Sequence, residues 1–227
     1  MKHALIIGGS RGLGLGLVRE YLARGWRVTT TVRTRSADLD ALRQGEVGRL
    51  TVETLDITQT GQAADLAQLL RDQTFDLLFL NAGMMAGRGV PLDAVPDSDI
   101  VSIFLTNAVS PIRVADALLG SVAAGGTIAF MSSILGSIGT NDDGRAELYR
   151  ASKAALNSLI RSFRARHAQA DFTVLAIHPG VVRTSMGGAS APLDIDTSVR
   201  GVADVIAARH GTGGQAFVDY RNEIIPW

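Results

Sequence analysis

The chain has 227 residues, and its 22 basic and 22 acidic side chains give a formal net charge of zero. A neutral chain has no electrostatic reason to bind a nucleic acid or an acidic membrane surface, and we expect neither as a partner. The chain has no cysteine, which excludes disulfides, thiolate metal ligands and cysteine nucleophiles, and we predict no metal site.

The amino-terminal residues show no signal-peptide pattern, because the first apolar run begins directly after Met1, Lys2 and His3. No apolar stretch approaches the roughly 18 residues that are needed to span a membrane. The length suits one large α/β domain. We therefore expect a single domain over residues 1–227 in a soluble, cytoplasmic protein.

Short apolar runs alternate with segments of helical periodicity along the whole chain. The predicted strands cover residues 4–7, 27–32, 50–55, 77–80, 127–131, 172–177 and 215–218. The predicted helices cover residues 14–24, 62–72, 97–119, 149–168 and 197–210. Continuously apolar strands that alternate with helices predict a doubly wound parallel α/β sheet with helices on both faces. Irregular segments 84–91, 137–147 and 184–196 follow strand ends, which is where such sheets bind ligands.

The first strand leads into a glycine-rich turn, in which Gly8, Gly12 and Gly14 form a G-x-x-x-G-x-G pattern. Glycine permits positive φ angles and close approach of the backbone to phosphate, and the helix that follows offers free N–H groups to an anion. No Gly-Lys-Ser/Thr follows, so the turn is not a P-loop. A ligand-free tight turn would show the same glycines, but the position in the first βα unit favours a dinucleotide.

The second strand ends without the acidic residue that would bind a free ribose hydroxyl in an NAD site. Arg33 stands there instead, with Arg35 nearby and Arg11 inside the glycine turn. Guanidinium groups suit a 2′-phosphate, so the pattern indicates NADP(H) rather than NAD(H). The alternative is that these arginines are solvated surface residues.

The helix predicted from residue 149 carries Tyr149 and Lys153, which lie four positions apart and therefore on one helical face. On their own they could form an ordinary surface pair. His178 ends the sixth strand, and we expect its ring to bond to backbone rather than to act in catalysis. Several apolar side chains on the loops could line a substrate pocket or close the core: Met84, Met85, Ile134, Leu135 and Met186.

Seven motifs in order make the chain similar to the short-chain dehydrogenase/reductase family. They are GGSRGLG, LDIT with Asp56, NAG from Asn81, TN with Asn107, SSILG with Ser133, YRASK with Tyr149, and HPGVVRT from His178. Within the family, YRASKAALN, HPG and the terminal IIPW most resemble a small subgroup of C-factor signalling proteins and carbonyl reductases.

This resemblance implies a Rossmann-type sheet of order 3-2-1-4-5-6-7, an NAD(P) cofactor, and a catalytic tetrad of Asn107, Ser133, Tyr149 and Lys153. Asp56 and Ile57 would hold the adenine, Asn81 would stabilise the central strands, and Val182 and Thr184 would contact the nicotinamide carboxamide. The predicted cofactor-binding set is Gly8, Ser10, Arg11, Gly12, Leu13, Gly14, Arg33, Asp56, Ile57, Asn81, Ala82, Gly83, Tyr149, Lys153, Pro179, Gly180, Val182 and Thr184. Family members often form dimers or tetramers through two long helices, here 97–119 and 149–168.

The chain departs from the family pattern at two places. Ile7 stands where a threonine is usual, which removes one side-chain hydrogen bond from the glycine turn. The interval between Ser133 and Tyr149 is also a few residues longer than in many members, because GTNDDGR intervenes. The longer loop borders the substrate site, so it affects substrate choice more than chemistry.

For carbonyl reduction, Tyr149 is the expected proton donor. A free phenol has a pKa near ~10, and a nearby Lys153 ammonium would lower it and hold the nicotinamide ribose. Ser133 would polarise the substrate oxygen, and by resemblance Asn107 would anchor a proton-relay water. The sequence thus predicts an NADP(H)-dependent oxidoreductase acting on a carbonyl or alcohol. The alternative is a dinucleotide-binding signalling or regulatory protein of the C-factor type with little or no turnover.

The last residues place Ile224, Ile225 and Trp227 at a free chain end. Such apolar side chains need cover. We expect the tail to dock either on its own domain or on a partner subunit.

Overall fold

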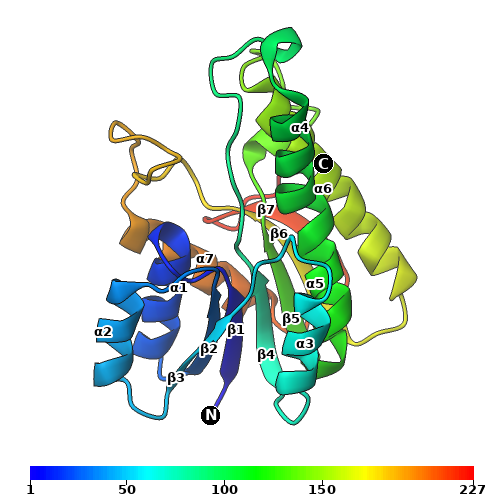
Figure 1. Ribbon diagram of the computed structural model, residues 1–227. Helices are drawn as coiled ribbons and strands as arrows, with labels where there is room; N and C mark the ends of the chain where they lie inside the picture. The colour runs from blue at the N-terminus through cyan, green and yellow to red at the C-terminus, as the bar shows by residue number, and fades with distance from the viewer.

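The computed structural model describes all 227 residues and centres on one parallel seven-stranded sheet (Figure 1). The strands lie in the order β3-β2-β1-β4-β5-β6-β7, which confirms the sequence-based order. Their bounds are β1 His3–Ile7, β2 Arg27–Val32, β3 Leu50–Thr54, β4 Phe75–Leu80, β5 Val122–Met131, β6 Phe172–His178 and β7 Gln215–Asp219. Strand β5 starts five residues before the predicted residue 127. Its register with β4 shifts between Phe75 and Leu77.

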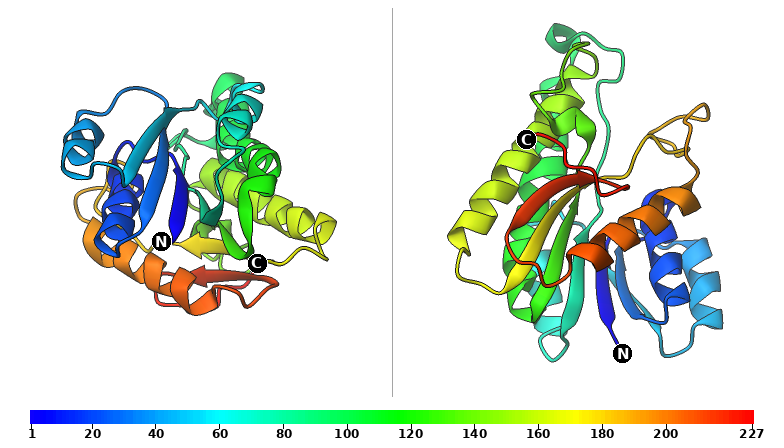
Figure 2. Two further views of the ribbon diagram at one scale, coloured as in Figure 1. Left: turned by 90° about the horizontal axis from the view of Figure 1, so that it is seen from below. Right: turned by 180° about the vertical axis from the view of Figure 1, so that it is seen from behind.

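Helices cover both faces of the sheet (Figures 1 and 2). One face carries α1 Gly12–Ala23, α2 Ala37–Gly45 and α7 Ile195–Arg209. The other carries α3 Gln62–Leu69, α4 Asp97–Phe104, α5 Ser110–Leu118 and α6 Glu147–Arg166. The short helical turns are η1 Leu92–Ala94, η2 Leu105–Val109, η3 Leu119–Ser121 and η4 Ile134–Gly136.

The core consists of two layers because successive strand residues point to opposite faces of the sheet. In β1, Ala4 and Ile6 belong to a cluster of 23 buried residues under α1 and α7. Leu5 and Ile7 belong to a cluster of 24 under α3, α5 and α6. The similar size of the two clusters explains why the strands read as continuous apolar runs.

Helix α2 was missed by the sequence analysis. Of its nine residues only Leu39 is buried, so the apolar periodicity was too weak to register. Its start signal was present, because the Ser36 hydroxyl accepts a hydrogen bond from Leu39 N and two aspartates lie in the first turn.

Residues Asp97–Ser121 run as one 25-residue helical stretch that, by length and composition, could cross a membrane. The expectation of no such stretch was therefore wrong. In the fold this stretch packs against α3 and α6, and it buries Ile103, Val114 and Ala115 completely. It serves as a core helix of the sheet layer, which passes the same test of length and hydropathy.

The C-terminal tail docks on its own domain. Ile225 is buried and its N–H donates to the carbonyl of Phe217 at 2.9 Å. The ring of Trp227 lies 5.5 Å from that of Phe217, and the Arg161 guanidinium lies 5.3 Å from the indole. The tail is thus held by β7 and α6 of its own chain, with Ile224 left 67% exposed.

Candidate active site at the carboxyl end of the sheet

Tyr149 and Lys153 lie in the first two turns of α6, at the carboxyl end of the sheet. Lys153 is almost fully buried, and its ammonium donates a hydrogen bond of 2.9 Å to the carbonyl of Met131 at the end of β5. Its Nζ atom is 5.8 Å from the centroid of the Tyr149 ring. The two side chains therefore share one face, as their spacing predicted, but the ammonium binds the strand end.

Ser133 completes this group from the end of β5. It caps the short turn η4 by accepting a hydrogen bond of 3.2 Å from Leu135 N, and its hydroxyl lies close enough to the phenol of Tyr149 to act on the pKa of that group. The preceding residue, Ser132, donates a 2.6 Å hydrogen bond from its hydroxyl to Asn157 Oδ1 of α6. The strand end and the helix are thus fixed to each other, which holds Ser133 against Tyr149.

The expected effect of Lys153 on Tyr149 is wrong for this structure. Burial raises the pKa of Tyr149 to about 12, and only the neighbouring Ser133 hydroxyl opposes that shift. Burial also lowers the pKa of Lys153 to about 8. Both changes follow from removal of a charged form from water, and the ammonium is engaged by a carbonyl rather than by the phenol.

Asn107 lies in η2, a π-helical turn that interrupts the long helix between α4 and α5. Its side chain accepts from Met84 N at 2.8 Å and donates to Met84 O at 2.8 Å, so it fixes the loop after β4. A Cβ atom at Gly83 would lie 3.3 Å from Asn107 Oδ1 and 3.7 Å from Lys153 Nζ. Asn107, Gly83 and Lys153 therefore meet at one point, in a helix irregularity of a kind that is frequent at functional sites.

The glycine turn is held by close backbone packing. Gly8 and Gly12 have positive φ angles of 91° and 54°. A Cβ atom at Gly14 would overlap the carbonyl oxygen of Gly8 and lie 2.6 Å from Asn81 Nδ2. That amide donates to Gly8 O at 2.8 Å, so Asn81 joins the turn to the end of β4.

Two neighbours of the turn were missed by the sequence analysis. A side chain at Gly9 would overlap the hydroxyl of Thr30 in β2. The hydroxyl of Thr31 accepts a 3.1 Å hydrogen bond from Gly8 N. Thr31 thus binds the turn from the neighbouring strand, although Ile7 itself brings no hydroxyl. The signal was the run of three threonines in β2.

Arg11 and Arg33 are exposed, and neither forms an ion pair, whereas Arg35 is bound to Asp40 at 2.6 Å. Asp56 accepts hydrogen bonds from the Thr58 hydroxyl and N–H at 2.7 and 2.9 Å. These bonds lower the pKa of Asp56, with the Arg33 charge adding to the effect. Arg33 and Asp56 therefore lie on the same side of the turn, where the sequence analysis placed the adenosine end of a cofactor.

The remaining residues of the predicted cofactor-binding set also lie at the carboxyl end of the sheet. The Ser10 carbonyl accepts from the Ser36 hydroxyl at 2.8 Å, and the Pro179 carbonyl accepts from Ser198 at 2.6 Å. Leu13 and Ile57 pack partly buried against the two cores, and Ala82 packs beside Gly8. Gly180 has a φ of 83°, and the chain after it forms a bridge between Val182 and Leu193. Thr184 lies opposite the turn, 3.9 Å from where a Cβ atom of Gly12 would be.

His178 does not make the backbone hydrogen bond that we expected. Its Nδ1 atom is buried and has no partner. Burial lowers the pKa of His178 to about 4, with Asp219 opposing the shift, so the ring is neutral at physiological pH.

The longer loop before α6 is clamped by Arg150, the neighbour of Tyr149. Its guanidinium donates to Asp143 Oδ1 and to the carbonyl of Arg145, both at 2.8 Å. The side chain of Arg145 also binds Asp143. Hydrogen bonds from Arg145 and then from Arg150 lower the pKa of Asp143 to about 2. The Asp143 carboxylate therefore stays charged when it binds the two arginines.

The apolar loop residues divide between core and surface. Met84 packs in a small cluster with Tyr149. Ile134 and Met186 are 38% and 39% exposed. Arg88 spans the two loops by contacting the Met186 carbonyl and the sulfur of Met85.

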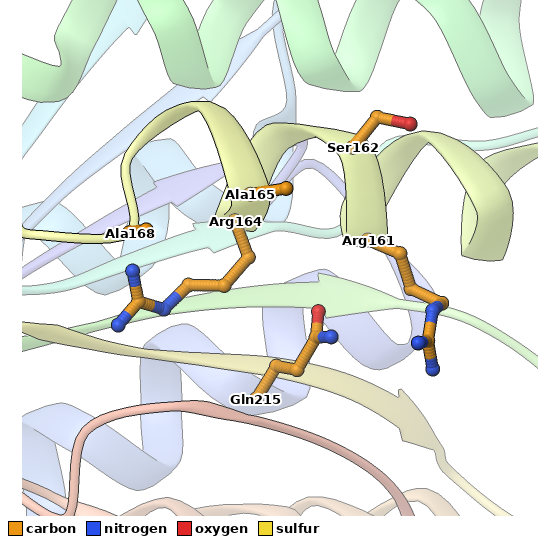
Figure 3. Close-up of a pocket in the computed structure, with 6 residues that line it drawn as sticks. All are labelled: Arg161, Ser162, Arg164, Ala165, Ala168 and Gln215. Atoms are coloured by element: carbon orange, nitrogen blue, oxygen red, sulfur yellow. The ribbon is translucent and has the colours of Figure 1, made fainter.

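The far end of α6 holds a separate hollow of about 440 Å³ (Figure 3). Arg161 and Arg164 flank Gln215, which opens β7. This hollow lies three turns of helix from Tyr149 and beside the amino end of a parallel strand, so we exclude it from the candidate site.

A model of the family described as short chain dehydrogenase matches residues 2–192. The chain is 38% identical over 154 residues to C-signal of Myxococcus xanthus, covering 67% of this chain and 92% of that protein. It is 46% identical, with a TM-score of 0.97, to a Burkholderia multivorans structure described as a short-chain dehydrogenase/reductase with bound NADP, covering 100% and 99% of the two chains. A Pseudomonas aeruginosa carbonyl reductase in complex with NADP is 40% identical, with a TM-score of 0.92 and full coverage of both chains.

Proposed function

Because the chain belongs to the short-chain dehydrogenase family, and is therefore an oxidoreductase, we propose that it transfers a hydride between NADP(H) and a carbonyl or alcohol substrate. One observation carries this proposal. The Ser133 hydroxyl lies close enough to the Tyr149 phenol to act on its pKa, beside a buried Lys153 and at the same sheet end as the glycine turn. A proton donor and a dinucleotide turn at one edge suit nicotinamide chemistry.

The glycine turn fits a dinucleotide. Gly8, Gly12 and Gly14 leave the backbone bare at the start of α1, and Arg11 precedes that helix without any side-chain cap on its free N–H groups. Such a turn presents N–H donors and the positive end of a helix dipole to a pyrophosphate. When bound, the cofactor supplies the hydride.

The NADP(H) preference rests on Arg11 and Arg33. Both are exposed and free of ion pairs, and no acidic side chain ends β2. A guanidinium without a carboxylate partner is available for a phosphate dianion. The Burkholderia and Pseudomonas structures described with NADP are consistent with this choice.

Tyr149 acts as the acid in carbonyl reduction. With a pKa raised to about 12 it carries its proton at neutral pH, so it can donate to an oxygen that gains negative charge. Ser133 donates its hydroxyl proton to the same substrate oxygen and so helps to polarise it. After the phenol has donated, Lys153, whose Nζ lies 5.8 Å from the centroid of the Tyr149 ring, returns a proton to it through a water held by Asn107, the residue that fixes the loop at Gly83.

Replacement of the phenol tests this chemistry. Tyr149→Phe keeps the ring but removes the proton donor, and we expect NADPH-dependent reduction of a panel of aldehydes, ketones and quinones to fall by about 1,000-fold. NADPH binding, followed by calorimetry, is the control for folding. An unchanged reduction rate in this variant would refute the mechanism.

Arg33→Ala tests the cofactor choice. Loss of a charge-assisted hydrogen bond costs about 1.5–3 kcal/mol, so NADPH affinity should fall roughly 10- to 100-fold and NADH affinity should change little. Arg71→Ala, at an exposed arginine that binds only its neighbour Asp72, is the matched control. Equal losses for the two nucleotides would remove the NADP(H) assignment.

A signalling role with little or no turnover is the second candidate, and its support is the 38% identity to C-signal. Turnover separates the two functions. If the purified protein binds NADPH but reduces no carbonyl across a broad panel, the signalling function is favoured.

A further inference from the structure

Ser152 lies in α6 between Tyr149 and Lys153, and its side chain is fully buried. It was assigned neither to the catalytic group nor to the cofactor-binding set. Its hydroxyl donates a 2.8 Å hydrogen bond to the carbonyl of Tyr149, one turn back along the helix. The same oxygen accepts a 3.1 Å hydrogen bond from Asn107 Nδ2 in η2. Ser152 therefore connects two residues of the candidate active site that belong to different helical segments.

The chemistry of the partners fixes the direction of both hydrogen bonds. A backbone carbonyl can only accept, so the Ser152 hydroxyl proton points at Tyr149 O. The hydroxyl oxygen can then only accept from Asn107, which must turn its NH2 group toward Ser152. Met84 requires the same orientation, because its N–H donates to Asn107 Oδ1 and its carbonyl accepts from Nδ2.

The amide of Asn107 has no donor left for any other group. Nδ2 carries two protons, and these go to Met84 O and to Ser152 Oγ. The side chain keeps acceptor capacity at Oδ1, which lies at the point where Gly83 approaches Lys153. A water bound to this side chain would therefore donate to it and keep its own oxygen free to accept from the Lys153 ammonium.

Ser162 shows what a serine in the same helix does without such a partner. Its hydroxyl donates to the carbonyl of Ser158 at 3.2 Å, its side chain is exposed, and it makes no second hydrogen bond. A bond from a helical serine to its own backbone is common and needs no functional reason. The hydrogen bond from Asn107 is what distinguishes Ser152.

We propose that Ser152 is a positioning residue for proton transfer, which orients the Asn107 amide and holds η2 against the turn of α6 that carries Tyr149. This inference rests on the proposed reductase function. Both hydrogen-bonding directions of the hydroxyl are occupied, so Ser152 acts through Asn107 rather than on the substrate.

Ser152→Ala tests the proposal, because it removes both hydrogen bonds and adds no atom. Ser162→Ala, which removes a backbone-directed hydroxyl from the same helix, is the matched control. We expect kcat for NADPH-dependent carbonyl reduction to fall about tenfold in Ser152→Ala, because small misplacements of catalytic groups slow the chemical step. KM and NADPH affinity should stay within about twofold of the wild type. Ser162→Ala should match the wild type throughout, and an unchanged kcat in Ser152→Ala overturns the proposal.

A double-mutant cycle with Asn107→Ala shows whether Ser152 acts through Asn107. Residues that act as one unit are not additive, so Ser152→Ala should lower kcat by less than about twofold when Asn107 is already alanine. A tenfold loss in both backgrounds would mean that Ser152 acts without Asn107, and the assignment would be wrong.

Hydrogen exchange of the Asn107 side-chain amide, followed by NMR, tests the contact without turnover. The signal is identified by its absence from Asn107→Ala. Both amide protons are hydrogen-bonded in a buried site and should exchange slowly in the wild type. We expect one of them to exchange at least about tenfold faster in Ser152→Ala and at the wild-type rate in Ser162→Ala. This result supports the positioning role even if none of the proteins consumes NADPH, in which case only the reductase function fails, whereas equal exchange in all three overturns it.

Discussion

The glycine turn and the C-terminal tail differ in how tightly they are packed. At the turn, backbone meets backbone, and there is no room for a Cβ atom at Gly14 beside the Gly8 carbonyl. At the tail, two aromatic rings and a guanidinium overlap loosely, and Ile224 remains 67% exposed. The first region can hold one chain conformation only, whereas the second can accept other side chains without loss of the fold.

The difference is one of packing: the turn leaves no space for a side chain, whereas the tail is held by a few side-chain contacts and two backbone hydrogen bonds. Where backbone atoms are in direct contact, larger residues cannot replace glycine. The glycine motif can therefore be recognised in the sequence. Loops and a tail held by a few side chains can change shape between relatives.

The largest effect is expected from a substitution at Gly14, in the glycine turn. In Gly14→Ala the new methyl group overlaps the Gly8 carbonyl oxygen, and α1 must move away from β1. We expect NADPH affinity, measured by calorimetry, to fall by at least about 1,000-fold and the melting temperature to drop. Gly61→Ala, where no atom lies within 4 Å of the added methyl group, should match the wild type. Near-wild-type affinity in Gly14→Ala would show that the turn is not rigid.

A second prediction concerns Lys153, whose ammonium binds the end of β5. Its pKa of about 8 means that the ammonium is lost as the pH rises above 8, while Tyr149, with a pKa of about 12, stays protonated. We expect kcat/KM for carbonyl reduction to fall about tenfold per pH unit above 8 and about 100-fold by pH 10. A pH–rate profile at saturating NADPH measures this, and a flat profile up to pH 10 would mean that the charge of Lys153 is not needed.

The tail should respond more mildly than the turn. Trp227→Ala removes the contacts with Phe217 and Arg161, which together amount to about 2 kcal/mol. We expect urea unfolding at a lower midpoint and NADPH affinity within about twofold of the wild type. Trp227→Phe keeps a ring and should recover most of the stability. If Trp227→Ala weakened NADPH binding strongly, the two regions would not be independent.

The smallest effect is expected on acidification. The folded pKa of His178 is lowered from 6.5 to about 4, so the unfolded chain binds the extra proton and stability is lost as the pH falls from 6.5 toward 4. By pH 5.5 the loss is about 1 kcal/mol. His178→Gln should show that much less acid dependence in urea unfolding between pH 7 and 5.5. His3, buried at the other end of the sheet with a similar pKa, should still titrate in that variant.

The sheet order, the glycine turn and the shared face of Tyr149 and Lys153 could be predicted because each depends on local spacing or on a family motif. Helix α2 could not, since one buried leucine gives no periodicity. The state of Tyr149 could not either, because helical spacing does not reveal that Lys153 would bind a carbonyl 22 residues away. The site of tail docking depended on Phe217 and Arg161, which come together only in the folded chain.

The docked tail also covers part of the open edge of the sheet. Strand β7 ends the sheet, and its outer backbone groups would be free to pair with another chain. The tail takes up part of them, because Ile225 N donates to Phe217 O and Asp219 N donates to Glu223 O, both at 2.9 Å. A chain cut after residue 221 would lose both hydrogen bonds and leave this edge of β7 unpaired, which favours aggregation during folding.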